Sequence, residues 1–261
     1  MPSDPISKVI LVTGGAQGLG EAVCRRMAAR AWAVAVADIN AEGAARVAAA
    51  CIREGGVAFP IVVDLASADG PARMVADAVH AAGRLDVLVN CAAAAPAESF
   101  LEMTADAWEL ALRVNVRAVA LAMAAAGREM ARHGAGRIVN ITSAAARMAL
   151  PNYCAYAATK AAVDSLTRSA AVALAPHGVR VNSLSPGMMD TPLQLRTEET
   201  FCRLEGRDDL ERFRDERTAR IPLRRRSTPE EMAQVVEWLA TDAPDYMTAE
   251  RLNVSGGLDK D

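Results

Sequence analysis

Residues 9–20, VILVTGGAQGLG, join a short apolar run to a glycine-rich turn. The apolar run has the length and composition of a buried strand, and the residues that follow have the spacing of a helix beginning near Gly18. Three glycines at these offsets let the chain turn sharply, let the backbone approach a pyrophosphate and let the helix pack closely on the strand. The helix N-terminus adds amide donors and a positive dipole end, so we predict a phosphate-binding turn. Its expected contact residues are Gly14, Gln17, Gly18, Leu19 and Gly20.

Apolar runs of strand length alternate with helical stretches along the rest of the chain. Nearly continuous apolar runs are typical of parallel strands that helices cover on both faces. We predict strands over 8–13, 33–38, 57–63, 85–90, 137–142, 179–185 and 251–254. We predict helices over 18–31, 41–54, 68–82, 104–133 in two pieces, 153–175 and 229–240. The pattern is typical of a doubly wound α/β sheet, and no repeat or linker interrupts it, so we expect a single domain over 1–261.

The stretch 194–226 breaks this alternation. It holds ten arginines and eight acidic residues, with few apolar residues among them. One interpretation is a solvated, salt-bridged helical face, which is typical of runs of mixed charge. The other is a mobile lid, with a substrate loop over about 188–226. The helix after it is clearly marked, because Thr228, Pro229 and Glu231 have the pattern of a capping box with proline at the first helical position.

The composition limits the classes of protein to which the chain can belong. Hydrophobic residues make up 52% and charged residues 23%, as in globular domains, and the formal net charge of -3 gives no basic field for nucleic acid. The N-terminal stretch MPSDPISKVILVTGG has the pattern of neither a signal peptide nor a spanning helix. Five cysteines at wide, irregular spacing favour a reducing compartment, so we expect a cytoplasmic protein without nucleic-acid or membrane partners. The three histidines lie far apart and in no zinc motif, so we expect no metal.

An acidic residue, Asp38, ends the second apolar run, eighteen residues beyond Gly20. A carboxylate at this place accepts hydrogen bonds from the adenosine ribose of NAD and repels the 2′-phosphate of NADP. Neither Gln17 nor the residues after Asp38, Ile39 and Asn40, offer a cation for that phosphate. We therefore expect NAD as the cofactor. An alternative is that Asp38 caps the helix that begins near residue 41.

A second set of residues can move a proton. Ser143 follows the fifth strand, and Tyr156 and Lys160 lie four residues apart on the next helix, so that phenol and ammonium share one face. A phenol pKa of about 10 leaves little phenolate at neutral pH, but a neighbouring ammonium and a positive nicotinamide ring favour phenolate. Tyr156 would then take the hydroxyl proton while a hydride leaves, and Ser143 would hold the substrate oxygen. The alternative is an ordinary pair on a helix surface; Tyr153 lacks such a partner, because Ala157 stands four residues after it.

With these residues the chain resembles the short-chain dehydrogenase/reductase family over essentially its whole length. The motifs that carry the resemblance are TGGAQGLG at 13–20, Asn115 in RVNVRAV, Ser143, Tyr156 with Lys160, and PGMMDT at 186–191. The resemblance implies a Rossmann-like sheet of about seven strands in the order 3-2-1-4-5-6-7. It also implies a catalytic tetrad of Asn115, Ser143, Tyr156 and Lys160, in which the asparagine helps to position a water that links the lysine to a proton relay.

The same resemblance implies further contacts with the cofactor. Lys160 would also bind the nicotinamide ribose, Asp64 would contact adenine, and residues of PGMMDT would flank the nicotinamide carboxamide. The cofactor-binding residues expected outside the glycine turn are Asp38, Ile39, Asp64, Leu65, Asn90, Ala92, Tyr156, Lys160, Pro186, Gly187, Met189 and Thr191.

The chain departs from the family pattern at three places. Asn90-Cys91-Ala92-Ala93 stands where the family commonly has Asn-Asn-Ala-Gly, and the methyl group of Ala93 would shift the local backbone or the cofactor. Ser255 stands where aspartate is frequent and Ala249 where glycine is frequent, and we expect both to be structural. We expect Cys91 and Cys154 to pack near the site without reacting, because no basic residue is predicted beside them.

The segments expected to line the substrate pocket are small or apolar and include methionines. They predict a compact alcohol or ketone, alicyclic or aromatic. An anionic group would be bound by Arg147 or by an arginine of 194–226, and the alternative for Arg147 is that it faces solvent. The expected pocket residues are Ala94, Ala145, Tyr153, Met188 and Leu193.

Three functions remain open. The first is an NAD-dependent dehydrogenase of a small apolar secondary alcohol or diol, and the second is a 3-oxoacyl thioester reductase that uses NADPH. The third, a non-catalytic NAD-binding sensor or scaffold, is disfavoured because Tyr156 and Lys160 are both present. The family pairs the helices at 104–133 and 153–175 across a two-fold axis, so we expect a homo-oligomer, a tetramer rather than a dimer.

Overall fold

Seven parallel strands form one sheet in the computed structural model, which describes residues 8–259. Their order is β3-β2-β1-β4-β5-β6-β7, as predicted, and every neighbouring pair is parallel. The strands are β1 (Val9–Thr13), β2 (Ala33–Asp38), β3 (Val57–Val62), β4 (Val87–Asn90), β5 (Gly136–Ile141), β6 (Val179–Pro186) and β7 (Arg251–Val254). The order reverses between β1 and β4, and in open sheets of this kind a ligand binds at that switch point, beyond the carboxyl ends of the strands.

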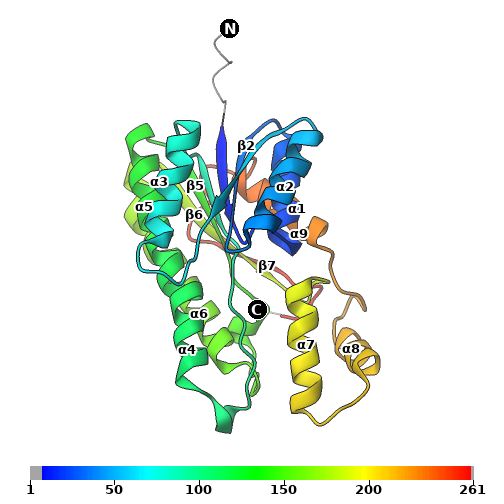
Figure 1. Ribbon diagram of the computed structural model, residues 1–261. Helices are drawn as coiled ribbons and strands as arrows, with labels where there is room; N and C mark the ends of the chain where they lie inside the picture. The colour runs from blue at the N-terminus through cyan, green and yellow to red at the C-terminus, as the bar shows by residue number, and fades with distance from the viewer. Residues whose placement is uncertain (1–7, 260–261) are drawn as a thin grey trace.

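Helices cover both faces of the sheet (Figure 1). One face carries α1 (Gly18–Ala29), α2 (Ala41–Arg53) and α9 (Pro229–Ala240). The other carries α3 (Gly70–Ala82), α5 (Ala118–His133) and α6 (Cys154–Leu174). The central strands are continuous apolar runs because both of their faces are covered, and every residue of β1 is buried. The predicted doubly wound α/β class is therefore confirmed.

The apolar stretch at 104–133 folds in two pieces, as predicted. α4 (Ala105–Leu112) and α5 are joined by a π-helical turn, Arg113–Arg117, which carries Asn115. Such turns occur frequently at functional sites. By length and composition alone the stretch is apolar enough to cross a membrane, a property that core helices of soluble proteins share, and in this fold α5 packs against α3 and α6.

The charge-rich stretch forms two helices whose bounds we did not predict, α7 (Pro192–Leu204) and α8 (Leu210–Thr218). Both extend beyond the edge of the sheet at which the strands end (Figure 1). Three buried apolar side chains anchor them and the loop that follows: Phe201, Phe213 and Ile221. These three side chains anchor the stretch although other apolar residues in it, Leu195, Leu204 and Leu223, are exposed.

Some charged residues of this stretch pair at the surface and others pair in the interior. Arg207 and Arg212 form the expected exposed salt bridges, both with Glu216. The interpretation as a solvated face is wrong for Glu198, whose carboxylate is completely buried among arginines. A buried carboxylate needs such partners, because its desolvation in an apolar environment is costly.

Two predicted boundaries shift for identifiable reasons. α3 begins at Gly70 rather than at residue 68, because the Ser67 hydroxyl donates to the Asp64 carbonyl (2.7 Å) and accepts from the Gly70 amide (3.0 Å). β4 begins at residue 87 rather than 85, because the preceding Asp86 turns its carboxylate back to the Val9 amide (2.8 Å). The predicted N-terminal stretch lies partly outside the described residues, since these begin at residue 8.

The start of α9 and the residues around β7 have the local structure that the sequence predicted. The Thr228 hydroxyl accepts from the Glu231 amide (3.2 Å) and the Glu231 carboxylate accepts from the Thr228 amide (2.9 Å), which confirms the capping box. Ala249 has φ of 65°, the left-handed conformation that glycine adopts most easily. Ser255 accepts from the Asp259 amide (3.0 Å) and so ties the chain end to β7. Ser255 therefore makes a structural contact, whereas Ala249 has a backbone conformation that favours the glycine frequent in the family.

Candidate active site

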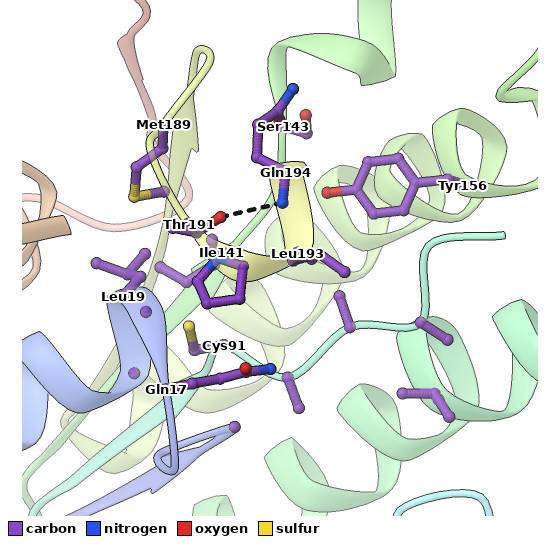
Figure 2. A pocket seen from close by; sticks show the side chains of 18 of the residues that line it. Gln17, Leu19, Cys91, Ile141, Ser143, Tyr156, Met189, Thr191, Leu193 and Gln194 are labelled. Atoms are coloured by element: carbon purple, nitrogen blue, oxygen red, sulfur yellow. Dashed lines mark hydrogen bonds between the residues drawn. The ribbon is translucent and has the colours of Figure 1, made fainter. Parts of the chain in front are cut away.

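A cavity of about 390 Å³ lies at the switch point between β1 and β4 and extends to α7 (Figure 2). This size is typical of sites for small molecules and cofactors. It brings together the glycine turn, the end of β2, and the proposed proton-transfer residues, which are far apart in the sequence. The predicted site residues that line it are Gly14, Gln17, Gly18, Leu19, Gly20, Asp38, Ile39, Asp64, Leu65, Ala92, Ala94, Ser143, Tyr153, Tyr156, Lys160, Pro186, Gly187, Met189, Thr191 and Leu193.

Four predicted site residues do not line this cavity. Asn90 is buried and donates to an asparagine side chain of β5, and Asn115 is completely buried behind the cavity wall. Ala145 is buried in the small apolar cluster that supports the two tyrosines. Met188 faces a separate, smaller cavity beside β7. The side chains of Asn90, Asn115 and Ala145 lie in the protein interior and that of Met188 faces the smaller cavity, so none of the four lines this one.

The turn after β1 fits the phosphates of a dinucleotide. Gly14 and Gly18 have φ of +69° and +54°, and a Cβ on Gly20 would lie 2.0 Å from the Gly14 carbonyl oxygen, so only glycine fits at the start of α1. Gln17 stands at the N-cap of α1 but makes no side-chain cap. The first amides of the helix thus lack a side-chain acceptor where the helix meets the cavity, and this arrangement favours an anion.

Asp38 lies where an adenosine ribose would be expected. Its Oδ2 accepts from the Ala16 amide (3.0 Å) and its Oδ1 from the Asn40 amide (2.9 Å). The alternative that Asp38 caps α2 is wrong, because the N-cap is Asn40, whose side chain accepts from the Gly43 amide (3.0 Å). Asp38 instead joins the end of β2 to the glycine turn and lines the cavity.

Sequence reasoning missed one cation in this neighbourhood, Arg46 of α2. Its guanidinium donates to the Ala16 carbonyl (2.8 Å) and to both carboxylate oxygens of Glu21 (3.0 and 2.7 Å). No inspection of the residues next to Asp38 could have found it, since it comes from the second turn of α2. The Glu21 carboxylate neutralises the charge of Arg46, so the glycine turn has an ion pair beside it rather than an unpaired cation.

The proposed proton-transfer residues lie at the inner end of the cavity. The hydroxyl of Tyr156 points into it, on the side where Ser143 and Gln194 lie (Figure 2). Lys160 is buried, its Nζ donates to the Ile141 carbonyl (2.7 Å), and it lies 5.5 Å from the centre of the Tyr156 ring. The strand end of β5 thus holds the ammonium, while α6 presents the phenol one helical turn away.

Burial governs the protonation of this pair. Burial raises the pKa of Tyr156 to about 12, and a hydrogen bond with Ser143 opposes the rise. Burial also lowers the pKa of Lys160 to about 8, since in each case the charged form loses hydration. We expected the neighbouring ammonium to lower the pKa of Tyr156. In the chain without a cofactor, burial raises this pKa instead.

Asn115 acts on the site through the backbone around it. Its Oδ1 accepts from the Ala94 amide (2.8 Å), and its Nδ2 donates to the Ala94 carbonyl (2.7 Å) and to the Thr159 hydroxyl (3.0 Å). Thr159 in turn donates to the Tyr156 carbonyl (2.7 Å). Both polar atoms of the side chain therefore contact protein groups, and the π-helical turn fixes the cavity wall against α6.

Several cavity residues were not predicted as contacts. Cys91 lines the cavity and is half-buried; burial raises the pKa of its thiol to about 11, although Lys160 lies close enough to oppose the rise. Gln194, Arg196 and Thr197 line it from α7. Their helix begins where the Thr191 hydroxyl accepts from the Gln194 amide (3.2 Å), the bond drawn in Figure 2. From the sequence, a helical face and a mobile lid both remained open for this segment and no helix bounds were predicted, so these three residues could not be placed on one wall.

Tyr153, predicted as a pocket residue, shapes the substrate end of the cavity. Its ring stacks on that of Tyr156, with centroids 4.3 Å apart, and meets Phe201 edge to face at 5.1 Å. Burial raises the pKa of its phenol far above the usual value, and a hydrogen bond with Thr197 opposes the rise. The stack therefore fixes the orientation of the Tyr156 ring and links it to α7.

A buried network of charges holds α7 in place. The Glu198 carboxylate accepts two bonds from Arg226 (2.7 and 2.9 Å) and one each from Nε of Arg214 and Arg217 (both 3.1 Å). Arg214 also donates to Asp190 (3.1 Å), in the loop that follows β6 and lines the cavity. The network joins α7, α8 and the segment before α9 to the cavity wall, so the geometry of that wall depends on it.

Comparison with known proteins identifies the class. The profile of the family described as enoyl-(acyl carrier protein) reductase matches residues 14–259. The chain belongs to the short-chain dehydrogenase/reductase family. Its relatives include the short-chain reductase protein NovJ of Streptomyces niveus, 38% identical over 95% of this chain and 93% of that protein. Another is cis-4-hydroxycyclohexanecarboxylate dehydrogenase of Sinomonas cyclohexanicum, 37% identical over 96% of each chain.

Solved structures resemble the chain over nearly its full length. A variant of actinorhodin polyketide ketoreductase with NADPH has a TM-score of 0.94 and 29% identity, over 99% of this chain and 100% of the other. NAD⁺-bound xylitol dehydrogenase has a TM-score of 0.92 and 30% identity, over 98% of this chain and 100% of the other. These similar proteins bind nicotinamide cofactors of both kinds, so the chain is an oxidoreductase of the alcohol–ketone type with a nicotinamide cofactor.

Proposed function

We propose that the chain is an NAD-dependent dehydrogenase of small secondary alcohols, with an apolar alicyclic or aromatic alcohol or diol as substrate. The observation that carries the proposal is that Tyr156, Ser143 and Lys160 line the same cavity as the glycine turn. Apolar Ala93, Ala94 and Leu193 line the cavity together with the polar Gln194 and Thr197 of α7. A relative whose name specifies an alicyclic hydroxy acid supports this substrate class.

The residues divide the chemistry among them. A nicotinamide cofactor, when bound, supplies the hydride acceptor for alcohol oxidation or the hydride donor for the reverse reaction. Tyr156 accepts the proton of the substrate hydroxyl, and Ser143 holds the substrate oxygen by a hydrogen bond. Lys160, with a pKa of about 8, is mostly protonated at neutral pH and stabilises negative charge on the phenol. Asn115 keeps the α6 backbone and the cavity wall in register.

The direct test measures initial rates with NAD and with NADP. The alcohols are small alicyclic and aromatic secondary alcohols, diols, sugars and hydroxyacyl thioesters, and absorbance of the reduced cofactor reports turnover. We expect turnover with NAD on alicyclic or aromatic alcohols. Activity only with NADPH and oxoacyl thioesters would contradict the proposal. If no alcohol is turned over but NADH stabilises the protein against heat, the sensor function is favoured.

Asp38 carries the proposed preference for NAD. Asp38→Ala is expected to reduce the ratio of kcat/KM for NAD to that for NADP by about 10- to 100-fold, because a charged hydrogen bond to ribose is lost and repulsion of the 2′-phosphate is removed. Asp77→Ala on exposed α3 is the matched control. If the ratio stays the same in both variants, Asp38 serves only the Ala16 and Asn40 amides.

One observation favours the alternative, an NADPH-dependent ketone reductase. Arg46 donates to the Ala16 carbonyl of the glycine turn, and Glu21 neutralises its charge. A 2′-phosphate could compete for this guanidinium. Combining Glu21→Gln with Asp38→Ala tests the alternative: we expect NADP to gain further over NAD only if Arg46 reaches the phosphate.

We further propose a cytoplasmic homotetramer. All five cysteines are free, which supports a reducing compartment. Leu112, Leu121 and Val172 are exposed apolar residues on α4, α5 and α6, the helices expected to pair between subunits. Light scattering on the full chain should give the mass of four chains, and a monomer at micromolar concentration would contradict this assembly.

A further inference from the structure

Arg196 is a charged residue of the cavity that the proposed chemistry does not use. Within residues 8–259, the charged side chains that line the cavity are Asp38, Asp64, Lys160 and Arg196. Asp38 and Asp64 follow β2 and β3, at the end assigned to adenosine. Lys160 is bound to the Ile141 carbonyl. Arg196 is therefore the cation of the cavity that remains for a further ligand.

The guanidinium of Arg196 makes no hydrogen bond or ion pair with any side chain or carbonyl in the described range 8–259. The exposed residues Arg203 and Arg220 likewise lack such a partner within this range. Arg196 is exposed too, and it differs from these two because it lines the cavity. Glu199 follows on the same helix but is exposed and forms no ion pair with it. An arginine that faces a cavity without a carboxylate partner is suited to a ligand anion, to which it can donate two parallel hydrogen bonds.

The position of Arg196 on α7 points to the substrate end. It lies one helical turn after Leu193, which also lines the cavity, and next to Thr197, which bonds to Tyr153. The glycine turn, in contrast, meets the start of the helix: a Cβ on Gly18 would lie 3.3 Å from Thr191. Arg196 is five residues further on, which places its Cα about 7.5 Å along the helix axis from that of Thr191.

We propose that Arg196 binds a carboxylate of the substrate, so that the substrate is a hydroxy acid whose alcohol and carboxylate are separated by an apolar ring. This inference rests on the proposed function of the same site. The hydroxyl lies at Tyr156 and Ser143, the ring lies against Leu193 and the alanines of the opposite wall, and the carboxylate reaches the guanidinium. Leu193 and the alanines between the two polar ends favour a ring over a polyol.

The test compares a charged and a neutral alcohol. Initial rates are measured with 4-hydroxycyclohexanecarboxylate and with 4-methylcyclohexanol, for the unmodified chain and for Arg196→Gln, Arg196→Lys and Arg203→Gln. Arg203 is the matched control, because it is an exposed arginine of the same helix outside the cavity. Isothermal titration of cyclohexanecarboxylate into the complex with NADH measures carboxylate binding without turnover.

Arg196→Gln is expected to lower the ratio of kcat/KM for the acid to that for the neutral alcohol by about 10- to 100-fold, mainly through KM, and to weaken cyclohexanecarboxylate by a similar factor. Arg196→Lys should recover part of both, and Arg203→Gln should change neither. The dissociation constant of NADH should stay the same in all variants.

Three results would overturn the assignment. An unchanged ratio with unchanged carboxylate binding means that no anion binds here, and weaker NADH binding with an unchanged ratio moves the contact to the pyrophosphate. An unmodified complex that binds cyclohexanecarboxylate no better than cyclohexanemethanol also excludes the carboxylate site. If the proposed function itself is wrong, no alcohol is oxidised. The titration with cyclohexanecarboxylate then still shows whether Arg196 binds a carboxylate, so the two failures can be distinguished.

Discussion

Tyr156→Phe is expected to lower kcat for alcohol oxidation by about 10²- to 10⁴-fold while the dissociation constant of NADH changes little. The variant loses the hydroxyl that accepts the substrate proton. It keeps the ring that stacks on Tyr153 with centroids 4.3 Å apart, so the cavity keeps its shape. Steady-state rates with saturating cofactor, together with fluorescence titration of NADH, separate the two quantities.

The matched control is Tyr153→Phe, which removes a phenol hydroxyl from the other ring of the same stack. That hydroxyl bonds to Thr197 of α7, so its loss should appear in KM for the alcohol rather than in kcat. If the two variants lower kcat equally, the assignment of Tyr156 as the base is wrong. If Tyr156→Phe retains full turnover, proton transfer does not pass through this residue at all.

The pH dependence of the unmodified enzyme provides a second measure of Tyr156. Its pKa in the chain, raised by burial to about 12, lies above the working range, so the base form becomes more abundant as the pH rises. Oxidation at limiting alcohol should therefore increase with pH across the neutral range. Reduction of the ketone uses the protonated phenol and should not show this increase. Tyr156→Phe should abolish the rise in the oxidation profile.

The central part of the site was predictable from sequence because short-range patterns specify it. The glycine turn and Asp38 follow directly after strands, and Tyr156 and Lys160 lie one turn apart on a helix. The regular repeats of strands and helices are therefore enough to locate these residues. Parallel strands buried on both faces are also easy to find, since few other elements are continuous apolar runs of this length. These features needed no knowledge of distant contacts.

The remainder depended on contacts between segments distant in sequence. Glu198 looks like any acid of a mixed-charge run, and its burial requires Arg226 from the segment before α9 as well as arginines of α8. Arg46 meets the glycine turn only through packing of α2 on α1. Asn115 was named by family resemblance, but its bonds to Ala94 arise from a π-helical turn that no periodicity indicates.

Glu198→Ala is expected to lower the free energy of unfolding by about 3–5 kcal/mol, because it leaves buried arginine charge without a partner. The side chain of Glu198 is 0% exposed and that of Arg226 only 6%, so water cannot replace the lost bonds. Glu199→Ala, on the exposed side of the same helix, is the matched control and should change stability little. Urea unfolding midpoints with unchanged slopes would give the differences.

The pH dependence of this stability follows from the charges around the carboxylate. Burial by itself raises the pKa of Glu198, but the hydrogen bonds and charge of Arg226, with those of its neighbours, hold it below its usual value. A carboxyl whose folded-state pKa is depressed contributes stability that is present above its unfolded pKa and is lost as the pH falls through the folded value. The ordinary pKa of a glutamate is about 4.5. The difference in free energy of unfolding between the unmodified chain and Glu198→Ala should therefore shrink as the pH falls below this value.

Replacing both members of the central pair distinguishes charge from packing. Glu198→Leu combined with Arg226→Met removes the carboxylate and the most deeply buried arginine together, so the double variant should be more stable than Glu198→Ala alone. Its KM should still rise, because Arg214 would lose the carboxylate that helps to align it with Asp190 and the cavity wall. A double variant as unstable as the sum of the single changes would show that shape, rather than compensation of buried charge, makes Glu198 necessary in α7.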